Sequence, residues 1–114
     1  MAFELVWLAE AREVYQQLMT AARAAFERRE GKGKSAKTEG LFKQLQKCLQ
    51  LQSENPRHPG LRTHEYHSFM HPYDEDQKVF EAYVQNQTPR ACRMFWCYGP
   101  KAKQITIIAI TPHP

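Results

Sequence analysis

The side chains in this sequence that could do chemistry are mainly arginines and histidines near predicted strand ends. They are Arg57, His58, Arg62, His64, Arg93 and His113. Cleavage of RNA through its 2′-hydroxyl needs a base for the 2′-OH proton, cations for the charged transition state and an acid for the leaving 5′-oxygen. Arginine and histidine around one phosphate can supply all three without a metal ion. The residue types therefore permit metal-independent RNA cleavage, and ordinary surface charge is the alternative.

The histidines also suggest a metal site, because imidazole is a common zinc ligand. His64, His67 and His71 would share one face of a helix, but this stretch has the pattern of extended backbone. On a strand, His64 and His67 point to opposite sides, and so do Cys92 and Cys97. A metal-dependent hydrolase would require the three histidines to converge in space. The sequence predicts no metal site and no cofactor.

Positive charge is concentrated in the middle third of the chain. The formal net charge is +4, and the excess comes from residues 31–64. The basic residues there are Lys32, Lys34, Lys37, Lys43, Lys47, Arg57 and Arg62, against Glu39 and Glu54. Such a distribution is expected of a face that meets phosphates, and a solvated lysine turn is the alternative.

The length of 114 residues, with 42% hydrophobic and 25% charged residues, is typical of one globular domain spanning residues 1–114. No apolar run approaches the roughly 18 residues of a membrane span. The first residues lack the basic flank and apolar core of a signal peptide. Three cysteines cannot form a closed set of pairs, and Cys48 is interpreted as an apolar core residue. These features predict a cytoplasmic protein without membrane contact.

The first half of the chain has the pattern of one strand followed by two helices. Residues 3–8 form a short apolar run that we interpret as a buried strand. Residues 9–30 place apolar side chains at three- and four-residue steps, which predicts an amphipathic helix that ends in a glycine turn. A second helix is expected to begin near Thr38, with Thr38 or Ser35 as N-cap, and to end at Asn55. Two helices joined by a short turn should pack as an antiparallel hairpin.

The second half has the pattern of a sheet. Strands are expected over residues 61–69, 79–84, 93–98 and 105–110, with a turn over 86–89. The last strand is apolar at nearly every position, which predicts a central strand covered on both faces. Short Asn/Pro and Gly/Pro turns favour antiparallel neighbours. The sequence therefore predicts an α+β fold, with an N-terminal strand, a helical hairpin and a mainly antiparallel sheet of about four strands.

The end of the chain resembles the C-terminal half of the RelE/ParE toxin superfamily. Arg93-Met94-Phe95-Trp96 is followed by Gly99-Pro100, then by residues 105–110 and by His113-Pro114. Family members end in an arginine-bearing strand, a turn, a very apolar strand and a terminal histidine or tyrosine. Residues 55–64 look like the proline-containing entry to the second strand of the family. The order of the elements also agrees over the whole length.

The resemblance implies a small bacterial toxin of a type II toxin–antitoxin pair, with a cognate antitoxin as its partner. RelE-like members cut mRNA in the ribosomal A site without a metal, whereas ParE-like members share the fold and poison DNA gyrase. Arg93 matches the strand arginine that contacts the scissile phosphate, and His113 matches the histidine proposed as general acid in YoeB-like members. Arg57, His58 and His64 lie near the segment that supplies a base or further cations.

The function expected on this basis is ribosome-dependent mRNA cleavage, with Arg93 holding the phosphate, His113 as acid and His64 or His58 as base. The cations expected to bind RNA are Arg57, Arg62, Lys32, Lys34, Lys37, Lys43 and Lys47. The alternative is a ParE-like or degenerate member that acts without catalysis by binding a protein partner such as gyrase. For Arg93 the alternative role is pairing with Glu81 on the adjacent strand.

Two departures from the family pattern bear on the cleavage activity and not on the fold. Pro114 stands where a tyrosine often follows the terminal histidine, and this sequence has histidines where RelE has lysines.

Overall fold

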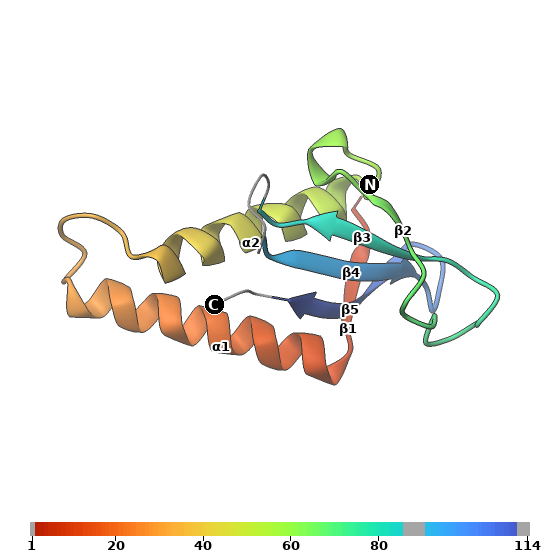
Figure 1. Cartoon of the computed structure of the whole chain (residues 1–114), viewed down its shortest axis with the longest axis horizontal. Helices are drawn as coiled ribbons and strands as arrows, with labels where there is room; N and C mark the ends of the chain where they lie inside the picture. Colours follow the sequence, from red (N-terminus) through yellow and green to blue (C-terminus); the bar gives the residue numbers. More distant parts are fainter. Residues whose placement is uncertain (1, 86–90, 112–114) are drawn as a thin grey trace.

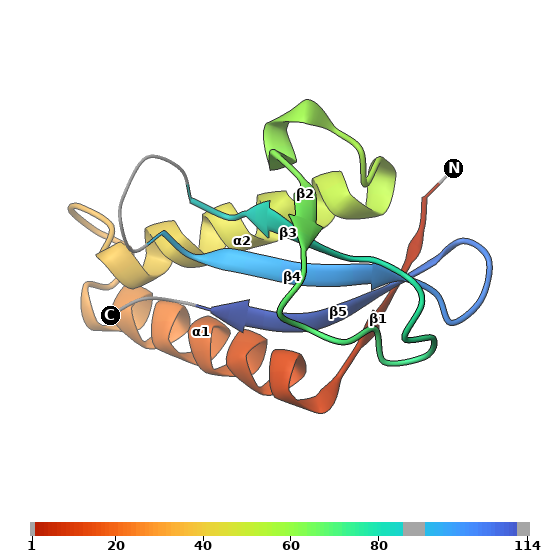
Figure 2. The same cartoon turned by 45° about the vertical axis from the view of Figure 1, so that its right-hand side comes forward.

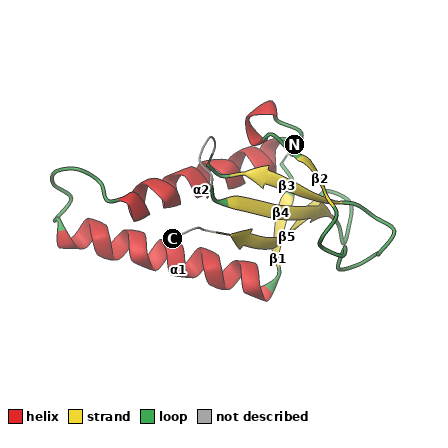
Figure 3. Cartoon of the chain, in the orientation of Figure 1, coloured by secondary structure: helices red, strands yellow, loops and turns green. Residues whose placement is uncertain are grey.

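Two helices pack on one face of a five-stranded sheet in the computed structural model, which describes residues 2–85 and 91–111 (Figure 1). The elements in chain order are β1 (Glu4–Trp7), α1 (Ala9–Arg28), α2 (Lys37–Glu54), the 3-10 turn η1 (Pro59–Leu61), β2 (His64–Tyr66), β3 (Val79–Tyr83), β4 (Arg93–Tyr98) and β5 (Gln104–Thr111). Figure 3 shows that the strand, the two helices and the run of strands follow one another as the sequence predicts. The predicted turn over residues 86–89 lies outside the described residues.

The strands lie in the order β1-β5-β4-β3-β2. β1 pairs in parallel with β5, and the other neighbours are antiparallel. β5 has a neighbour on each side and is buried at most positions, which confirms the prediction of a covered interior strand. The prediction of a buried strand at residues 3–8 is wrong. β1 lies at the edge of the sheet, so its side chains are exposed or half-buried.

The helices pack side by side as the predicted antiparallel hairpin (Figure 1). α1 turns the small residues Ala11, Ala22 and Ala25 inward, which lets its backbone approach the neighbouring elements closely. The predicted N-cap of α2 is wrong, because Ala36 occupies this position. Glu39 accepts the Ala36 amide hydrogen bond at 2.8 Å and so supplies the capping oxygen from within the helix. No helix in the described part of the chain is both long and apolar enough to cross a membrane.

The main core lies between the helices and the sheet. Its members include Leu45, Leu49, Met94, Trp96, Ile105 and Ile107. Burial of each such side chain stabilises the fold by about 1.5–3 kcal/mol. The opposite face of the sheet, which we call the helix-free face, carries a smaller cluster of Val79, Phe95, Cys97 and Ile108. Side chains of β4 alternate between the two clusters, and a register shift interrupts its pairing with β5 between Phe95 and Trp96.

The three cysteines are buried and free. Cys48 and Cys92 belong to the core under the helices and Cys97 to the cluster on the other face, as the sequence predicts. Burial raises the pKa of Cys48 and Cys97 to about 12 and that of Cys92 to about 11. The thiols are therefore protonated at neutral pH and are poor nucleophiles.

One buried ion pair joins the two helices of the hairpin. Arg29, at the end of α1, donates to both carboxylate oxygens of Glu39 at 2.6 and 2.9 Å. Its Nη1 also donates to the carbonyls of Lys32 and Gly33 in the intervening turn. The guanidinium and the Ala36 amide lower the pKa of Glu39 to about 2. Glu39 thus fixes the end of one helix, the turn and the start of the next.

We predict that Glu39→Gln destabilises the chain at neutral pH and that this effect shrinks on acidification. The pKa of Glu39 is lower in the folded state than in the unfolded state, so its contribution is present above about pH 4.5 and is lost as pH falls towards about 2. Urea unfolding of both proteins at pH 6, 4 and 2.5 measures the difference. Glu13→Gln, on the exposed face of α1, is the matched control. A difference that stays constant with pH would contradict this role.

Candidate functional site

A row of three ionisable side chains crosses the helix-free face, one from each of three neighbouring strands. His64 on β2 is the register partner of Glu81 on β3, and Arg93 on β4 lies on the other side of Glu81. The His64 Nε2 lies 2.5 Å from Glu81 Oε1, and the Arg93 Nη1 lies 2.8 Å from Glu81 Oε2. The Glu81 side chain is 4% exposed, whereas His64 and Arg93 are 48% and 38% exposed. A buried carboxylate therefore holds two partly exposed groups.

The electrostatics of this row are set by Glu81. A carboxylate removed from water is costly unless it is paired, so Arg93 and His64 are the groups that make its position tolerable. The contact of Oε2 with Arg93 is an ion pair without the alignment of a hydrogen bond, and this buried oxygen has no hydrogen-bond partner. Glu81 Oε2 therefore retains capacity to accept a hydrogen bond from a better-aligned donor.

His64 faces acceptor oxygens at both ring nitrogens. Its Nε2 contacts Glu81, and its Nδ1 lies 3.2 Å from the carbonyl of Arg62. Only the imidazolium form can donate to both oxygens at once. The ring of Tyr83 meets His64 edge-on, with the ring centroids 5.6 Å apart. The imidazole of His64 is therefore held between a carboxylate, a backbone carbonyl and an aromatic ring.

A cavity of about 450 Å³ opens beside His64, and we call it the basic pocket. Its charged and imidazole lining consists of Arg57, His58, Arg62, His64, Glu65 and Lys78. Glu65 is paired with Lys78 at 3.1 Å. Within residues 2–85 and 91–111, no carboxylate lies within ion-pair distance of Arg57 or Arg62. Two arginines of this lining therefore lack a carboxylate partner, and the Arg57 guanidinium lies 5.8 Å from the centroid of the Phe80 ring.

The structure brings several of the predicted site residues together. Arg57, His58, Arg62 and His64 line the basic pocket, and His64 joins it to Arg93 through Glu81. The Nδ1 of His58 accepts the amide hydrogen bond of Gly60 at 2.9 Å and so caps η1, which occupies one of its two nitrogens.

The predicted RNA-binding lysines are spread along the molecule. Lys47 lines a neighbouring cavity of about 520 Å³ together with His58 and Tyr83, and Lys43 lies on the same helix. Lys32 and Lys34 lie in the turn between α1 and α2 and Lys37 begins α2, at one end of the 48 Å long axis and far from β2 (Figure 1). These lysines do not join the row. His113 lies outside the described residues.

The three histidines considered for a metal site have separate partners. His64 contacts Glu81, His67 Nδ1 lies 3.7 Å from Glu65, and His71 Nε2 lies 3.0 Å from the Tyr98 carbonyl. Among the residues that the structure describes, no three His, Cys, Asp or Glu side chains are placed to hold a metal ion.

Glu81 is the residue whose importance the sequence did not reveal, since it was considered only as an alternative partner for Arg93. The sequence feature that points to Glu81 is its place as a glutamate in the middle of the apolar strand Val79–Tyr83. Glutamate is almost never fully buried unless it is paired. A charged residue at such a position therefore points to cationic neighbours on the adjoining strands.

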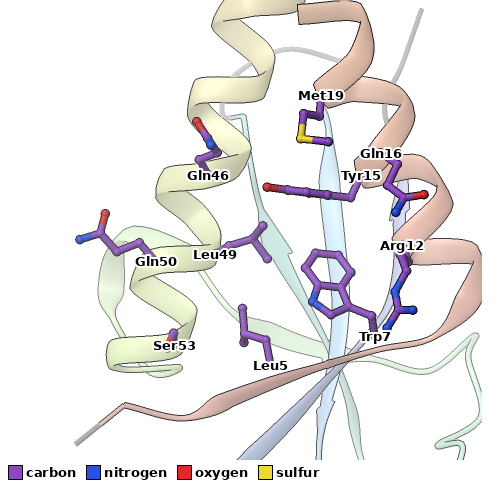
Figure 4. A pocket seen from close by; sticks show the side chains of 10 residues that line it. All are labelled: Leu5, Trp7, Arg12, Tyr15, Gln16, Met19, Gln46, Leu49, Gln50 and Ser53. Atoms are coloured by element: carbon purple, nitrogen blue, oxygen red, sulfur yellow. The ribbon is translucent and has the colours of Figure 1, made fainter. Parts of the chain in front are cut away.

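The groove in the helical layer has a different character (Figure 4). It measures about 590 Å³ and lies between α1, α2 and β1. The rings of Trp7 and Tyr15 and the side chains of Leu5 and Leu49 point into it. Arg12 is the one charged residue of its lining. The row of His64, Glu81 and Arg93 lies on the helix-free face, away from this groove.

The fold is that of a known toxin structure. The chain superposes on "YoeB/ParE toxin from Agrobacterium tumefaciens" with a TM-score of 0.59 and 10% sequence identity, covering 97% of this chain and 99% of that one. No protein-family model and no curated protein sequence matches this chain. At this identity the similarity shows the fold, and it confirms the predicted RelE/ParE-like α+β architecture.

We predict that Arg93→Met lowers the free energy of unfolding by about 2 kcal/mol, because it leaves the buried Glu81 carboxylate with His64 alone. Adding Glu81→Gln should recover most of this loss, since the double variant has no buried charge. Urea unfolding at pH 7 measures both, with the exposed Arg23→Met as control. Losses that simply add in the double variant would show that the two side chains are energetically independent.

Proposed function

We propose that this chain is a RelE/YoeB-like toxin of a type II toxin–antitoxin pair that cuts mRNA on the ribosome without a metal ion. The observation that carries the proposal is the row of His64, Glu81 and Arg93 on the open face of a sheet with the fold of a YoeB/ParE toxin. Two partly exposed cationic or ionisable groups held by one buried carboxylate are suited to binding a phosphodiester and moving a proton beside it.

Arg93 is proposed to bind the scissile phosphate. Its Nη1 is held by Glu81, and at 38% exposure the guanidinium still offers further N–H groups to solvent. A guanidinium can donate in parallel to two phosphate oxygens and stabilises the charge that grows on them in the transition state. Glu81 acts as a positioning residue, because its carboxylate fixes the guanidinium before the substrate arrives.

His64 is proposed as the general base, in preference to His58. The neutral ring with its proton on Nε2 can donate to Glu81. Its Nδ1 lone pair then faces the Arg62 carbonyl, and two acceptors form no hydrogen bond. A substrate 2′-hydroxyl would give that nitrogen a donor, and Glu81 would stabilise the imidazolium that results. His64 contacts a carboxylate that can stabilise its imidazolium, whereas no such contact of His58 is present among the described residues, and its Nδ1 accepts the Gly60 amide. His113 remains the proposed acid for the leaving 5′-oxygen.

The basic pocket supports the proposal that the substrate is a polyanion. Arg57 and Arg62 extend the positive surface from His64 away from Arg93, so that a nucleic-acid strand can contact both. The distant lysines at the end of the hairpin would add contacts to ribosomal RNA, and such binding weakens steeply with salt. A toxin of this kind would act in the cytoplasm and would be neutralised by a cognate antitoxin.

A second candidate function is non-catalytic binding of a protein partner such as DNA gyrase. The Arg93–Glu81 ion pair favours it, because it gives the arginine a structural role that needs no substrate. The name of the structurally similar protein also joins YoeB and ParE. The two functions differ in one observable, because only the nuclease cuts transcripts.

We predict that induced expression of the native chain in a bacterial host arrests growth and produces transcripts whose new 5′ ends lie inside translated codons. Arg93→Ala, His113→Ala and His64→Gln should each abolish arrest and cleavage, while Arg23→Ala should act like the native chain. Soluble yield and circular dichroism confirm that the variants are folded. Arrest with intact transcripts would favour the binding function, and cleavage retained by Arg93→Ala and His113→Ala would contradict the site assignment.

A further inference from the structure

Three aromatic rings form a continuous cluster on the helix-free face beside Arg93, and we call them the aromatic shelf. They are Tyr66, Phe69 and Phe95, with centroid distances of 4.5 Å for Tyr66–Phe95, 5.0 Å for Phe69–Phe95 and 5.4 Å for Tyr66–Phe69. The Arg93 Cζ lies 5.9 Å from the centroid of the Phe95 ring. Phe95 is 2% exposed, but Phe69 is 38% exposed. The shelf therefore has a buried base and an exposed outer ring.

The loop that carries Phe69 is pinned to the sheet. It connects β2 to β3 and passes over the sheet in Figure 2. His71 Nδ1 accepts the amide hydrogen bonds of Tyr73 and Asp74, so that Nε2 donates to the Tyr98 carbonyl. The hydroxyl of Tyr73 lies 2.9 Å from Thr106 Oγ1 on β5. Because the loop is already ordered, an aromatic ligand of Phe69 would meet a preformed surface.

The surrounding charges select the kind of ligand that fits. Arg93 on one side of Phe95 attracts a phosphate. Beyond Phe69 the same loop carries Asp74, Glu75 and Asp76, which are exposed and would repel one. The surface next to Phe69 is therefore suited to an uncharged flat group whose attached phosphate lies on the Arg93 side. An unpaired nucleobase has this chemistry.

We propose that Phe69, supported by Tyr66 and Phe95, is a stacking site for one unpaired base of a nucleic-acid strand whose phosphate lies at Arg93. Arg93 and Phe95 are two residues apart on one strand face, a separation of roughly 7 Å, and the exposed Phe69 ring lies 5.0 Å from that of Phe95. Base–aromatic stacking contributes about 1–3 kcal/mol per base and does not depend on the base sequence. The inference rests on the proposed function in that it places a phosphate at Arg93.

The test uses a short 2′-O-methyl RNA oligonucleotide, which cannot be cleaved, with 2-aminopurine at one internal position. Stacking on a protein ring quenches its fluorescence. Phe69→Leu keeps the apolar volume without the ring, and we expect it to lose most of the quenching and to bind at least 5-fold more weakly. Phe69→Tyr should retain both properties. Met70→Leu, at the neighbouring 72% exposed position, is the matched control and should change the affinity less than 2-fold.

The salt dependence separates stacking from charge. Phe69→Leu should leave the slope of log K against log salt unchanged, whereas Arg93→Gln should make it shallower because a phosphate contact is lost. Unaltered quenching and affinity in Phe69→Leu, or no quenching by the native chain, would overturn the inference. The exposed Phe69 would then be a candidate contact for a protein partner. Stacking without growth arrest would overturn the proposed function alone. Arrest and cleavage with no Phe69-dependent quenching would overturn the stacking site alone.

Discussion

The interaction on which the site depends is the pairing of one buried carboxylate with two side chains from neighbouring strands. Glu81 is 3% exposed in the middle of β3, whose other buried positions, Val79 and Ala82, are apolar. A charge in this position requires partners, and the register of β2, β3 and β4 supplies His64 and Arg93 on the same face. The sheet therefore has to be assembled in this register for the charge to be tolerated. The same pairing leaves two partly exposed groups facing solvent.

The two helices and the loop from β2 to β3 lie on opposite faces of the sheet. The hairpin, fixed by the Arg29–Glu39 ion pair, covers one face and forms the larger core. The other face is covered in part by the loop from β2 to β3, whose contacts with Tyr98 and Thr106 leave the row of Glu81 open beside it. The row of Glu81 is thus open on the face that the helices leave free, and the apolar groove of the helical layer is separate from it.

Much of the architecture could be predicted from local sequence patterns. In α1, apolar residues at three- and four-residue steps indicate a helix with one buried face. In β5, the continuous apolar run indicates a strand buried on both faces. Glu81 could not be recognised in this way, because strand register decides which side chains meet and leaves no local signature. The edge position of β1 was missed for a similar reason, since its pairing with β5 spans almost the whole chain. The N-cap of α2 was missed because Glu39, inside the helix, supplies the oxygen.

The central claim is that the carboxylate of Glu81 organises a site for RNA cleavage. The most direct test is the rate of mRNA cleavage by purified native chain and Glu81→Gln on programmed ribosomes, with both proteins shown to be folded. Glutamine keeps the shape of the side chain but can no longer stabilise an imidazolium or hold the guanidinium by charge. We predict a loss of at least about 100-fold, the scale of general acid–base catalysis. Cleavage at the native rate by Glu81→Gln, or none by the native chain, would contradict the account.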